Sequence, residues 1–406
     1  MKQTNQQIVI LGAGYAGLLA TLRLARLTRG LNTHITLVNK ADVFVERIRL
    51  HEQAVRKPAR VLKLAQLLRG TRVAFVQGCV QSLDVRDKHV HVQTNSGAQA
   101  IPYDKLVVAL GSSVDVDALP GAREYAHALT PESVGALHSQ LAAPSTQTVL
   151  ICGGGLTGIE AAAEFAEAHR HLRITLATRG QVGENLSDKA RAHIRRVFAR
   201  LGITLRENVS ITRIQSKAAH TAHEVIPFDV CVWAGSVAVP ALAREAGLQV
   251  NARGQIEVDA TLHSVSHAEV VAVGDAAAVT CTVPIRMACA TANPMAALAA
   301  NNLAAELRGK AQQPFVFGYL AKNISLGRKD GVIDFAQADD TPRGAIWTGR
   351  LAAAYKEFVG RTVLQLILME RYWSGMYQVQ PRADKPGFLK KPGLSARAYL
   401  HHDRSV

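Results

Sequence analysis

The sequence has little charge, few aromatic residues and few cysteines. Charged residues make up 19% and aromatic residues 5% of its 406 residues, whereas hydrophobic residues make up 48%, so the composition excludes disorder for most of the chain. The five cysteines include no CxxC pair, which argues against a disulfide framework, a zinc ribbon and a cysteine-relayed redox mechanism. No run approaches about 18 apolar residues, so we expect no helix that spans a membrane. The histidines show no ligand spacing, and we expect no metal site.

Positive charge, in contrast, is in excess. Lys and Arg outnumber Asp and Glu by 47 to 32, and the last 66 residues hold 11 basic against 4 acidic residues. Nucleic acid, an anionic membrane surface and phosphorylated cofactors are the partners that such an excess attracts. The chain has no basic helix with a base-reading pattern and no aromatic platform, so nucleic acid is not expected. The first residues run directly into a strand-like segment, so we expect no signal peptide and a cytoplasmic location.

A glycine-rich loop lies near the start of the chain, between a predicted strand and a predicted helix. Residues 7–11 are apolar, residues 12–17 read Gly-Ala-Gly-Tyr-Ala-Gly, and residues 18–27 have the composition of a helix. A second apolar strand, residues 35–38, completes a βαβ unit of the size that binds dinucleotides. Its first glycine permits a tight turn, its second lets the backbone approach a pyrophosphate, and the helix N-terminus attracts the phosphates.

The same pattern occurs a second time. Residues 149–152 form a predicted strand, residues 153–158 a second glycine loop, residues 159–168 a predicted helix and residues 174–177 the next strand. A lone glycine loop is weak evidence, but two copies in the strand–loop–helix context favour two dinucleotide sites. We therefore expect a flavin and a nicotinamide cofactor.

In each βαβ unit, the residue at the end of the second strand helps to determine which nucleotide is bound. Asn39 stands where an acidic residue normally binds the ribose hydroxyls, and its amide can still form a hydrogen bond there. The second unit has Thr178 and Arg179 at this place, with no carboxylate to repel a 2′-phosphate. This favours NADPH, although Arg179 is equally well explained as a solvated loop residue.

Taken together, these motifs resemble those of the two-dinucleotide-binding-domain flavoproteins. More narrowly, the chain resembles the type II NADH:quinone oxidoreductases and the related ferroptosis suppressor protein family. The matching segments are residues 8–17, 103–112, 153–160, 232–235 and 271–275, and the narrower match continues into residues 324–331.

The resemblance implies roles for particular residues. Asp275 corresponds to the aspartate that binds the ribityl chain of the flavin, and Met287 and Ala288 to the helix start that approaches its pyrimidine edge. Glu160 corresponds to a glutamate where nicotinamide meets flavin, with a favourable helix-dipole contact as the alternative. Arg371 is the nearest candidate for a basic residue that the family places beside the flavin. The expected cofactor-binding residues are Gly12, Gly14, Tyr15, Ala16, Gly17, Asn39, Lys40, Val80, Ala109, Gly111, Gly153, Gly155, Gly158, Thr178, Arg179, Gly235, Gly274, Asp275, Met287 and Ala288.

The predicted fold class is α/β, with two Rossmann-like dinucleotide-binding domains and a small C-terminal α+β module. We expect a discontinuous FAD domain over residues 1–113 and 245–315, with a small antiparallel meander in residues 73–101. An NAD(P)H domain over residues 114–244 would lie between its parts, and the C-terminal module with its basic tail would cover residues 316–406.

The C-terminal module contains a predicted helix from about Trp347 to Tyr372. Its apolar residues recur at helical spacing, and Lys356, Arg361 and Arg371 lie around them. Such a face suits an anionic membrane surface, and the alternative is packing on the body or in a homodimer. The apolar residues of this face are Val359, Val363, Leu366, Ile367 and Tyr372.

The predicted activity is that of an FAD-dependent oxidoreductase. It would transfer hydride from NAD(P)H to FAD and then electrons to an acceptor, for which a quinone is the first choice. The alternatives are a soluble reductase of a ferredoxin or rubredoxin, a flavin enzyme that acts on a biosynthetic intermediate, and a flavin-bound scaffold without turnover. His51 and Glu52 are candidates for the flavin edge, with an ordinary core or surface position as the alternative.

Overall fold

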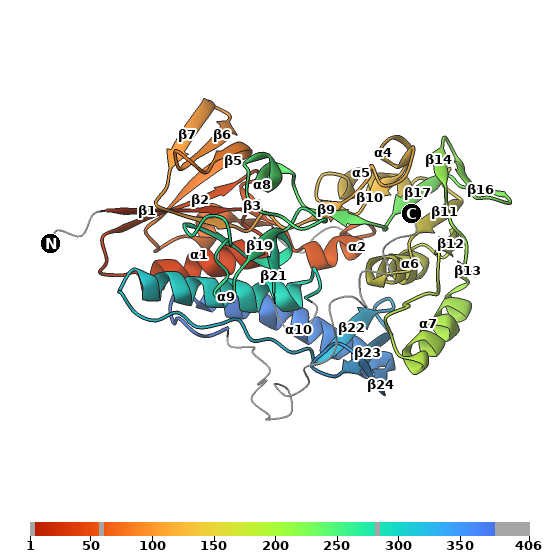
Figure 1. The fold of residues 1–406 in the computed structure, drawn as a ribbon. Helices are drawn as coiled ribbons and strands as arrows, with labels where there is room; N and C mark the ends of the chain where they lie inside the picture. The colour runs from red at the N-terminus through yellow and green to blue at the C-terminus, as the bar shows by residue number, and fades with distance from the viewer. Residues whose placement is uncertain (1–4, 57–60, 281–284, 378–406) are drawn as a thin grey trace.

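A seven-stranded sheet organises the first half of the molecule and takes its strands from residues 6–108 and 270–272 (Figure 1). The structure, a computed structural model, describes residues 5–56, 61–280 and 285–377. The first five strands in the spatial order, from β20 to β5, are parallel. Strand β5 also begins the antiparallel meander with β6 and β7, which the sequence predicted within residues 73–101. In spatial order the strands are β20 (Val270–Ala272), β8 (Lys105–Val108), β1 (Gln6–Leu11), β2 (Thr33–Asn39), β5 (Val73–Asp84), β6 (His89–Thr94) and β7 (Gly97–Pro102).

Helices α1 (Tyr15–Leu27) and α9 (Cys289–Glu306) pack side by side against this sheet. Helix α1 follows β1 through the first glycine loop and starts three residues earlier than the sequence predicts. Leu18 and Leu22 of α1 and Met295 of α9 are fully buried in the same apolar cluster as the strands. Burial of such side chains stabilises the fold by about 1.5–3 kcal/mol each.

A five-stranded parallel sheet organises the second half, on the right in Figure 1. A small antiparallel sheet follows it, and a pair of short antiparallel strands, β9 and β18, links the two halves. The large sheet has the order β10 (His127–Ala128), β17 (Val230–Trp233), β11 (Thr148–Cys152), β12 (Arg173–Ala177) and β13 (Thr204–Arg206). The other elements are α5 (Val134–Leu141), α6 (Leu156–Ala168), α7 (Asp188–Leu201), β14 (Arg213–Gln215), β15 (Ala218–His220), β16 (Val225–Pro227), β9 (Ser113–Val114) and β18 (Val237–Ala238).

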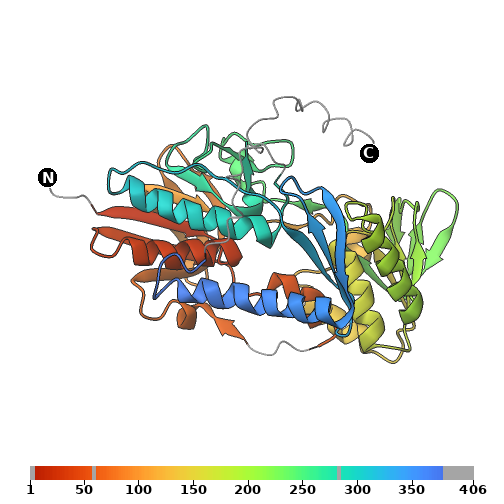
Figure 2. The same cartoon turned by 90° about the horizontal axis from the view of Figure 1, so that it is seen from below.

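The C-terminal unit contacts both halves (Figure 2). Its antiparallel sheet packs against α6 and α7, where Asp330 accepts hydrogen bonds from His193 (2.9 Å) and Arg200 (2.6 Å). Its helix packs along α1, where the buried pair Arg23–Glu370 joins the two helices, with Nε 2.9 Å from Oε2. The unit consists of β22 (Ala321–Ser325), β23 (Gly331–Ala336), β24 (Pro342–Thr348) and α10 (Gly349–Met369).

Short elements connect these units. The part that matters most for the site runs from β3 through η1 into α2, where the chain passes from the first half towards α6. These elements are β3 (Val43–Phe44), η1 (Arg47–Arg49), α2 (Leu50–Gln53), β4 (Leu62–Lys63), α3 (Leu64–Leu67), α4 (Ala122–Tyr125), α8 (Leu242–Glu245), β19 (Ile256–Val258), η2 (Gly274–Ala276) and β21 (Ala277–Val279).

The structure confirms the predicted fold class. Each glycine loop lies between a buried parallel strand and a helix, and the C-terminal unit combines a sheet with one helix. The proposed domain boundaries stay predictions. Within the described residues, no helix is long and apolar enough to cross a membrane.

Part of the apolar face that the sequence offered for membrane contact packs on the body. Ile367 is buried in the core cluster of the first half, and Val363 and Leu366 pack against it, whereas Tyr372 is 52% exposed. For Val363, Leu366 and Ile367 the alternative, packing on the body, therefore agrees with the structure. The basic tail beyond residue 377, with Lys385, Lys390 and Lys391, lies outside the described residues.

Candidate cofactor and active sites

The first glycine loop, residues 12–17, is closed by contacts that only glycine permits. Gly12 has φ +92°, and a Cβ there would lie 2.5 Å from the carbonyl oxygen of Ala109. A Cβ on Gly17 would lie 1.8 Å from the carbonyl oxygen of Gly12. Gly14, in contrast, faces open space, so a ligand can approach the backbone at the N-terminus of α1. This is the geometry that a pyrophosphate-binding loop requires.

A cavity of about 520 Å³ opens beside this loop. Its volume lies within the range of cofactor sites, about 300–1,000 Å³. Gly17 does not line the cavity but packs against Gly12 and Ala109, which do. Met287 and Ala288 do not line it either; they precede α9, whose residues Cys289 and Ala292 line the cavity. An FAD fits this arrangement, because the glycine loop, the end of β2 and the aspartate of η2 border one cavity. The predicted residues that line it are Gly12, Gly14, Tyr15, Ala16, Asn39, Lys40, Val80, Ala109, Gly111, Gly274 and Asp275.

Asp275 is held by a residue that the sequence analysis did not identify. Ser112, just after β8, donates a hydrogen bond of 2.6 Å to Asp275 Oδ2, and Gln255 donates one of 3.0 Å to the Asp275 carbonyl. These contacts fix the carboxylate at the end of β20, where it lines the cavity. The position of Ser112 after a buried strand was the signal that could have identified it.

Asn39 has a structural role besides the predicted one. Its Oδ1 accepts a hydrogen bond of 2.8 Å from the backbone N–H of Ala13, and its Nδ2 donates one of 2.8 Å to the carbonyl of Ala41. The amide therefore ties the end of β2 to the glycine loop. A carboxylate could accept the first bond but could not donate the second. The contact to a ribose hydroxyl stays a prediction.

The second glycine loop, residues 153–158, repeats the geometry of the first. Gly153 has φ +129°, and a Cβ there would lie 2.6 Å from the carbonyl oxygen of Ala234. A Cβ on Gly158 would lie 1.9 Å from the carbonyl oxygen of Gly153, whereas Gly155 faces open space. Gly235 follows β17 beside Gly153. The N-terminus of α6 is thus as open to a phosphate as that of α1.

The end of β12 is followed by an arginine that forms no ion pair within the described residues. Thr178 lies against Gly154, where a Cβ would be 2.5 Å from Thr178 Oγ1. Arg179 is exposed, and in the described part of the chain it makes neither a hydrogen bond nor an ion pair. Its guanidinium is therefore free to bind an anion.

Glu160, in the second turn of α6, forms an ion pair with Lys356 of α10. The backbone N–H of Ser325 donates a further hydrogen bond of 3.0 Å to the same oxygen, Oε1. Burial alone would raise the pKa of Glu160, but Lys356, His51 and the Ser325 N–H outweigh it and hold this pKa below its ordinary value. The pair is therefore a carboxylate beside an ammonium group.

The structure does not bring Arg371 to this site. Arg371 follows α10, where its guanidinium lies 4.4 Å from the centre of the Tyr372 ring and lines a cavity with Arg29 and Thr71. The basic residue of the C-terminal unit that contacts Glu160 is Lys356, which the sequence analysis assigned only to a membrane face. A catalytic role for Arg371 has no support from this geometry.

A second cavity, of about 880 Å³, adjoins the Glu160–Lys356 pair. Lys356 and Ser325 line it, as do several charged residues of η1, α2 and the turn between β22 and β23. The segment from Val45 to Arg49 separates it from the flavin cavity: residues 45, 47 and 48 line the flavin cavity, and residues 46 and 49 line the second one. A molecule in the second cavity would therefore lie next to the flavin cavity.

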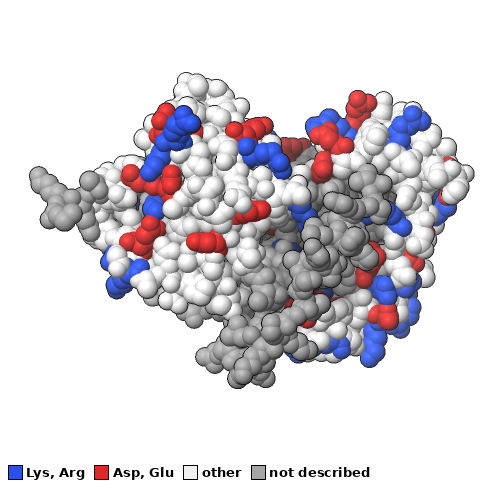
Figure 3. All heavy atoms as spheres, viewed as in Figure 1, with Lys and Arg blue, Asp and Glu red and all other residues white. Residues whose placement is uncertain are grey.

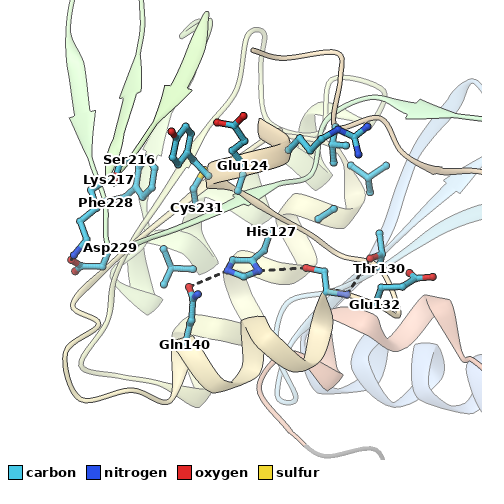
Figure 4. A pocket seen from close by; sticks show the side chains of 18 of the residues that line it. Glu124, His127, Thr130, Glu132, Gln140, Ser216, Lys217, Phe228, Asp229 and Cys231 are labelled. Carbon is cyan, nitrogen blue, oxygen red and sulfur yellow. Dashed lines mark hydrogen bonds and ion pairs between the residues drawn. The ribbon is translucent and has the colours of Figure 1, made fainter. Parts of the chain in front are cut away.

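A third cavity, of about 690 Å³, lies in the second half and contains none of the predicted site residues (Figure 4). His127 projects into it between Gln140 (3.0 Å) and Ser133 (3.4 Å). Asp229 is already bound by Thr148 and by the N–H of Gln147. We therefore assign no cofactor to this cavity.

Curated relatives of the chain include a quinone reductase and a ferroptosis suppressor protein. A demethylphylloquinone reductase of Synechocystis is 28% identical over 296 residues, which is 68% of this chain and 73% of the relative. Ferroptosis suppressor protein 1 of Xenopus tropicalis is 23% identical over 397 residues, which is 94% of this chain and 98% of the relative. The predicted resemblance is therefore confirmed.

Solved structures share the fold. NDH2 of Plasmodium falciparum, solved with NADH, superposes with a TM-score of 0.76 at 14% identity and covers 92% of this chain and 99% of that one. Putidaredoxin reductase, in a complex with putidaredoxin, gives a TM-score of 0.67 at 22% identity and covers 82% of both chains. The family model for pyridine nucleotide-disulphide oxidoreductases matches residues 6–302. The chain is a member of the pyridine nucleotide-disulphide oxidoreductase family, which uses FAD and NAD(P)H.

Proposed function

We propose that this oxidoreductase reduces a quinone with electrons from NAD(P)H. The observation that carries the proposal is the second cavity, which shares the Val45–Arg49 wall with the flavin cavity and has the Lys356–Glu160 pair at its edge. A bound FAD supplies the two-electron chemistry between nicotinamide and acceptor. The quinone-reducing relative supports the choice of acceptor.

The residues of this chain would bind the two cofactors, orient them and protonate the reduced quinone. The two glycine loops bind the pyrophosphates, and Asp275 accepts a hydrogen bond from a hydroxyl of the flavin side chain. Lys356 lines the second cavity with an ammonium group that can donate a proton, and Glu160 and the carbonyl of Asn323 hold that group in place. A reduced quinone oxygen gains negative charge, which an ammonium both stabilises and protonates.

The acceptor is tested by turnover of the purified yellow protein with NADPH and a range of acceptors. We expect short-chain benzoquinones and naphthoquinones to be reduced much faster than an iron–sulfur protein such as putidaredoxin or a rubredoxin. Acidic and basic side chains are interspersed on the face shown in Figure 3. This face therefore has no patch of uniformly positive charge that could dock an acidic iron–sulfur protein. Faster reduction of the iron–sulfur protein would contradict the proposal.

We also propose that NADPH is used at least as well as NADH. We expect Arg179→Ala to raise the KM for NADPH by about 10- to 100-fold, because one charge-assisted hydrogen bond to the 2′-phosphate is lost. The KM for NADH should change little. The exposed Arg196 of α7 provides a matched control as Arg196→Ala. An equal change for both cofactors would show that Arg179 does not contact the phosphate.

The protein is further proposed to bind an anionic membrane surface through the outer face of α10. An apolar stripe runs along this face at helical spacing, and the exposed Arg350 and Lys329 lie near it. Leu351 is 81% exposed and Phe358 is 63% exposed, which is unusual for side chains of this size. A hydrophobic quinone would be taken up from such a surface. The stripe consists of Leu351, Tyr355 and Phe358 of α10, and Trp347 of β24 extends it, with its ring centre 5.8 Å from that of Tyr355.

Vesicle sedimentation tests this surface. We expect the double variant Leu351→Asp, Phe358→Asp to lose binding to anionic vesicles at low salt. Two apolar side chains that would contact the lipid become negatively charged and are repelled by its head groups. The control is Val225→Asp on β16, which changes a side chain that is 53% exposed and distant from α10. Wild-type protein that ignores such vesicles but dimerises through α10 in light scattering would overturn the membrane proposal.

A further inference from the structure

A buried histidine lies between two carboxylates beside the Lys356–Glu160 pair. His51, in α2, is 4% exposed. Its Nδ1 is 3.9 Å from Oε2 of Glu160, and its Nε2 is 3.9 Å from Oε1 of Glu52. Among the described residues, Nε2 has no hydrogen-bond partner. A buried polar atom without a partner destabilises a fold, so packing does not explain why this position holds an imidazole.

The surroundings of His51 keep its ring neutral. Burial lowers the pKa of His51 most; Glu160 and Glu52 act in the opposite direction, while Lys356 and Arg328 lower it further. A neutral imidazole has one N–H donor and one acceptor nitrogen. It can therefore accept a proton at one nitrogen while it releases one from the other. The charged groups that act on it are Glu52, Glu160, Lys356 and Arg328. Glu52 also pairs with Arg49, and Arg328 also pairs with Glu164 and Glu357.

We propose that His51 relays protons from Glu52 to Glu160 and so restores the proton that Lys356 gives to the acceptor. Glu52 lines the second cavity and forms ion pairs with Arg49 and Arg328, whereas Glu160 contacts Lys356. The imidazole is the described group that lies within 4 Å of both carboxylates. The inference rests on the proposed quinone reduction. His51 acts through Glu160 and is a positioning residue.

The proton balance of the reaction requires such a path. NAD(P)H gives up a hydride, which carries two electrons and one proton. A quinone needs two electrons and two protons to become a hydroquinone. One further proton per turnover must therefore come from solvent. In the proposed path the two 3.9 Å gaps first close to hydrogen bonds by side-chain rotation. The proton enters at Glu52 and is taken up by Nε2 of His51 while the Nδ1 proton passes to Glu160, which returns it to Lys356. A flip of the ring then restores the starting tautomer.

The test compares an acceptor that takes up protons with one that does not. We expect His51→Gln to slow quinone reduction by about 10²-fold, the lower end of what a positioned proton donor contributes. Ferricyanide reduction should stay at the wild-type rate, because ferricyanide takes up electrons alone. Reduction of the flavin by NADPH should also be unchanged. The solvent deuterium isotope effect on quinone reduction should rise in the variant.

Two further variants separate a relay from a structural role. His51→Leu should melt at or above the wild-type temperature, because it removes an unpartnered polar atom, yet it should show the same loss with quinone. In His51→Ala, added imidazole should restore part of the rate. His138→Gln is the matched control, because His138 of α5 contacts the carbonyl of Ala54, next to α2, and takes no part in the proposed path.

The outcomes distinguish this inference from the proposed function. If the wild-type protein reduces ferricyanide but no quinone, the proposed function itself is contradicted. If the wild type reduces quinones, then equal loss with quinone and ferricyanide in His51→Gln, or no loss with either, would overturn the relay.

Discussion

Replacing Lys356 by Met is expected to lower the rate of quinone reduction by about 10²- to 10⁴-fold, the range for a positioned proton donor. The substitution keeps the length of the side chain and removes the ammonium group that contacts Glu160 and the carbonyl of Asn323. Rapid-mixing measurement of flavin reoxidation by a quinone reports this rate directly. The control is Lys329→Met, because Lys329 lines the same cavity but is exposed and, within the described residues, forms no ion pair.

The same variant has an expected pH signature. Lys356 is the main favourable charge that keeps the pKa of Glu160 low against burial, so its loss should raise that pKa. In the wild type the lowered pKa adds stability above the unfolded value of about 4.3, and this stability is lost as pH falls through the folded pKa. In Lys356→Met this contribution should disappear, at a cost of about 1–3 kcal/mol near pH 7. Equal rates and equal acid unfolding in the two lysine variants would contradict the assignment.

Alanine at Gly17 is expected to abolish flavin binding, whereas alanine at Gly158 should leave the protein yellow and impair NAD(P)H binding. Each new Cβ would lie within 2 Å of a carbonyl oxygen of its own loop, so the loop must move. Such overpacking costs about 1–3 kcal/mol and displaces the backbone N–H groups from the pyrophosphate. Flavin absorbance of the purified variants and the KM for NADPH measure the two effects separately.

The control for general instability is Gly135→Ala. Gly135 lies in helix α5 with open space around its Cα, so alanine there should be neutral or slightly stabilising. If Gly17→Ala keeps its flavin, or if Gly158→Ala loses it, the assignment of the two loops to the two cofactors is wrong.

The fold and both glycine loops were predictable because their signals are local. Each loop follows a buried strand and opens a helix within about 30 residues, so short-range order determines its geometry. Asp275 was likewise marked by its place after a buried strand. Ser112, which holds it, has the same kind of signal but no distinctive residue type.

The proposed active site was harder to predict because its parts are distant in sequence. Lys356 and Glu160 are separated by 196 residues, and their contact depends on how α10 packs on the body. The sequence showed that α10 is amphipathic but not which of its faces is buried. The same uncertainty of register explains why the sequence favoured Arg371, which lies away from Glu160, and why it left open whether this apolar face packs on the body.

The most direct test of the central claim is anaerobic rapid mixing of the purified protein with one equivalent of NADPH and then with one equivalent of a short-chain naphthoquinone. We expect the visible absorbance of oxidised flavin to be lost in the first step and regained in the second, with one hydroquinone formed per NADPH consumed. A flavin that NADPH reduces but a quinone does not reoxidise would contradict it.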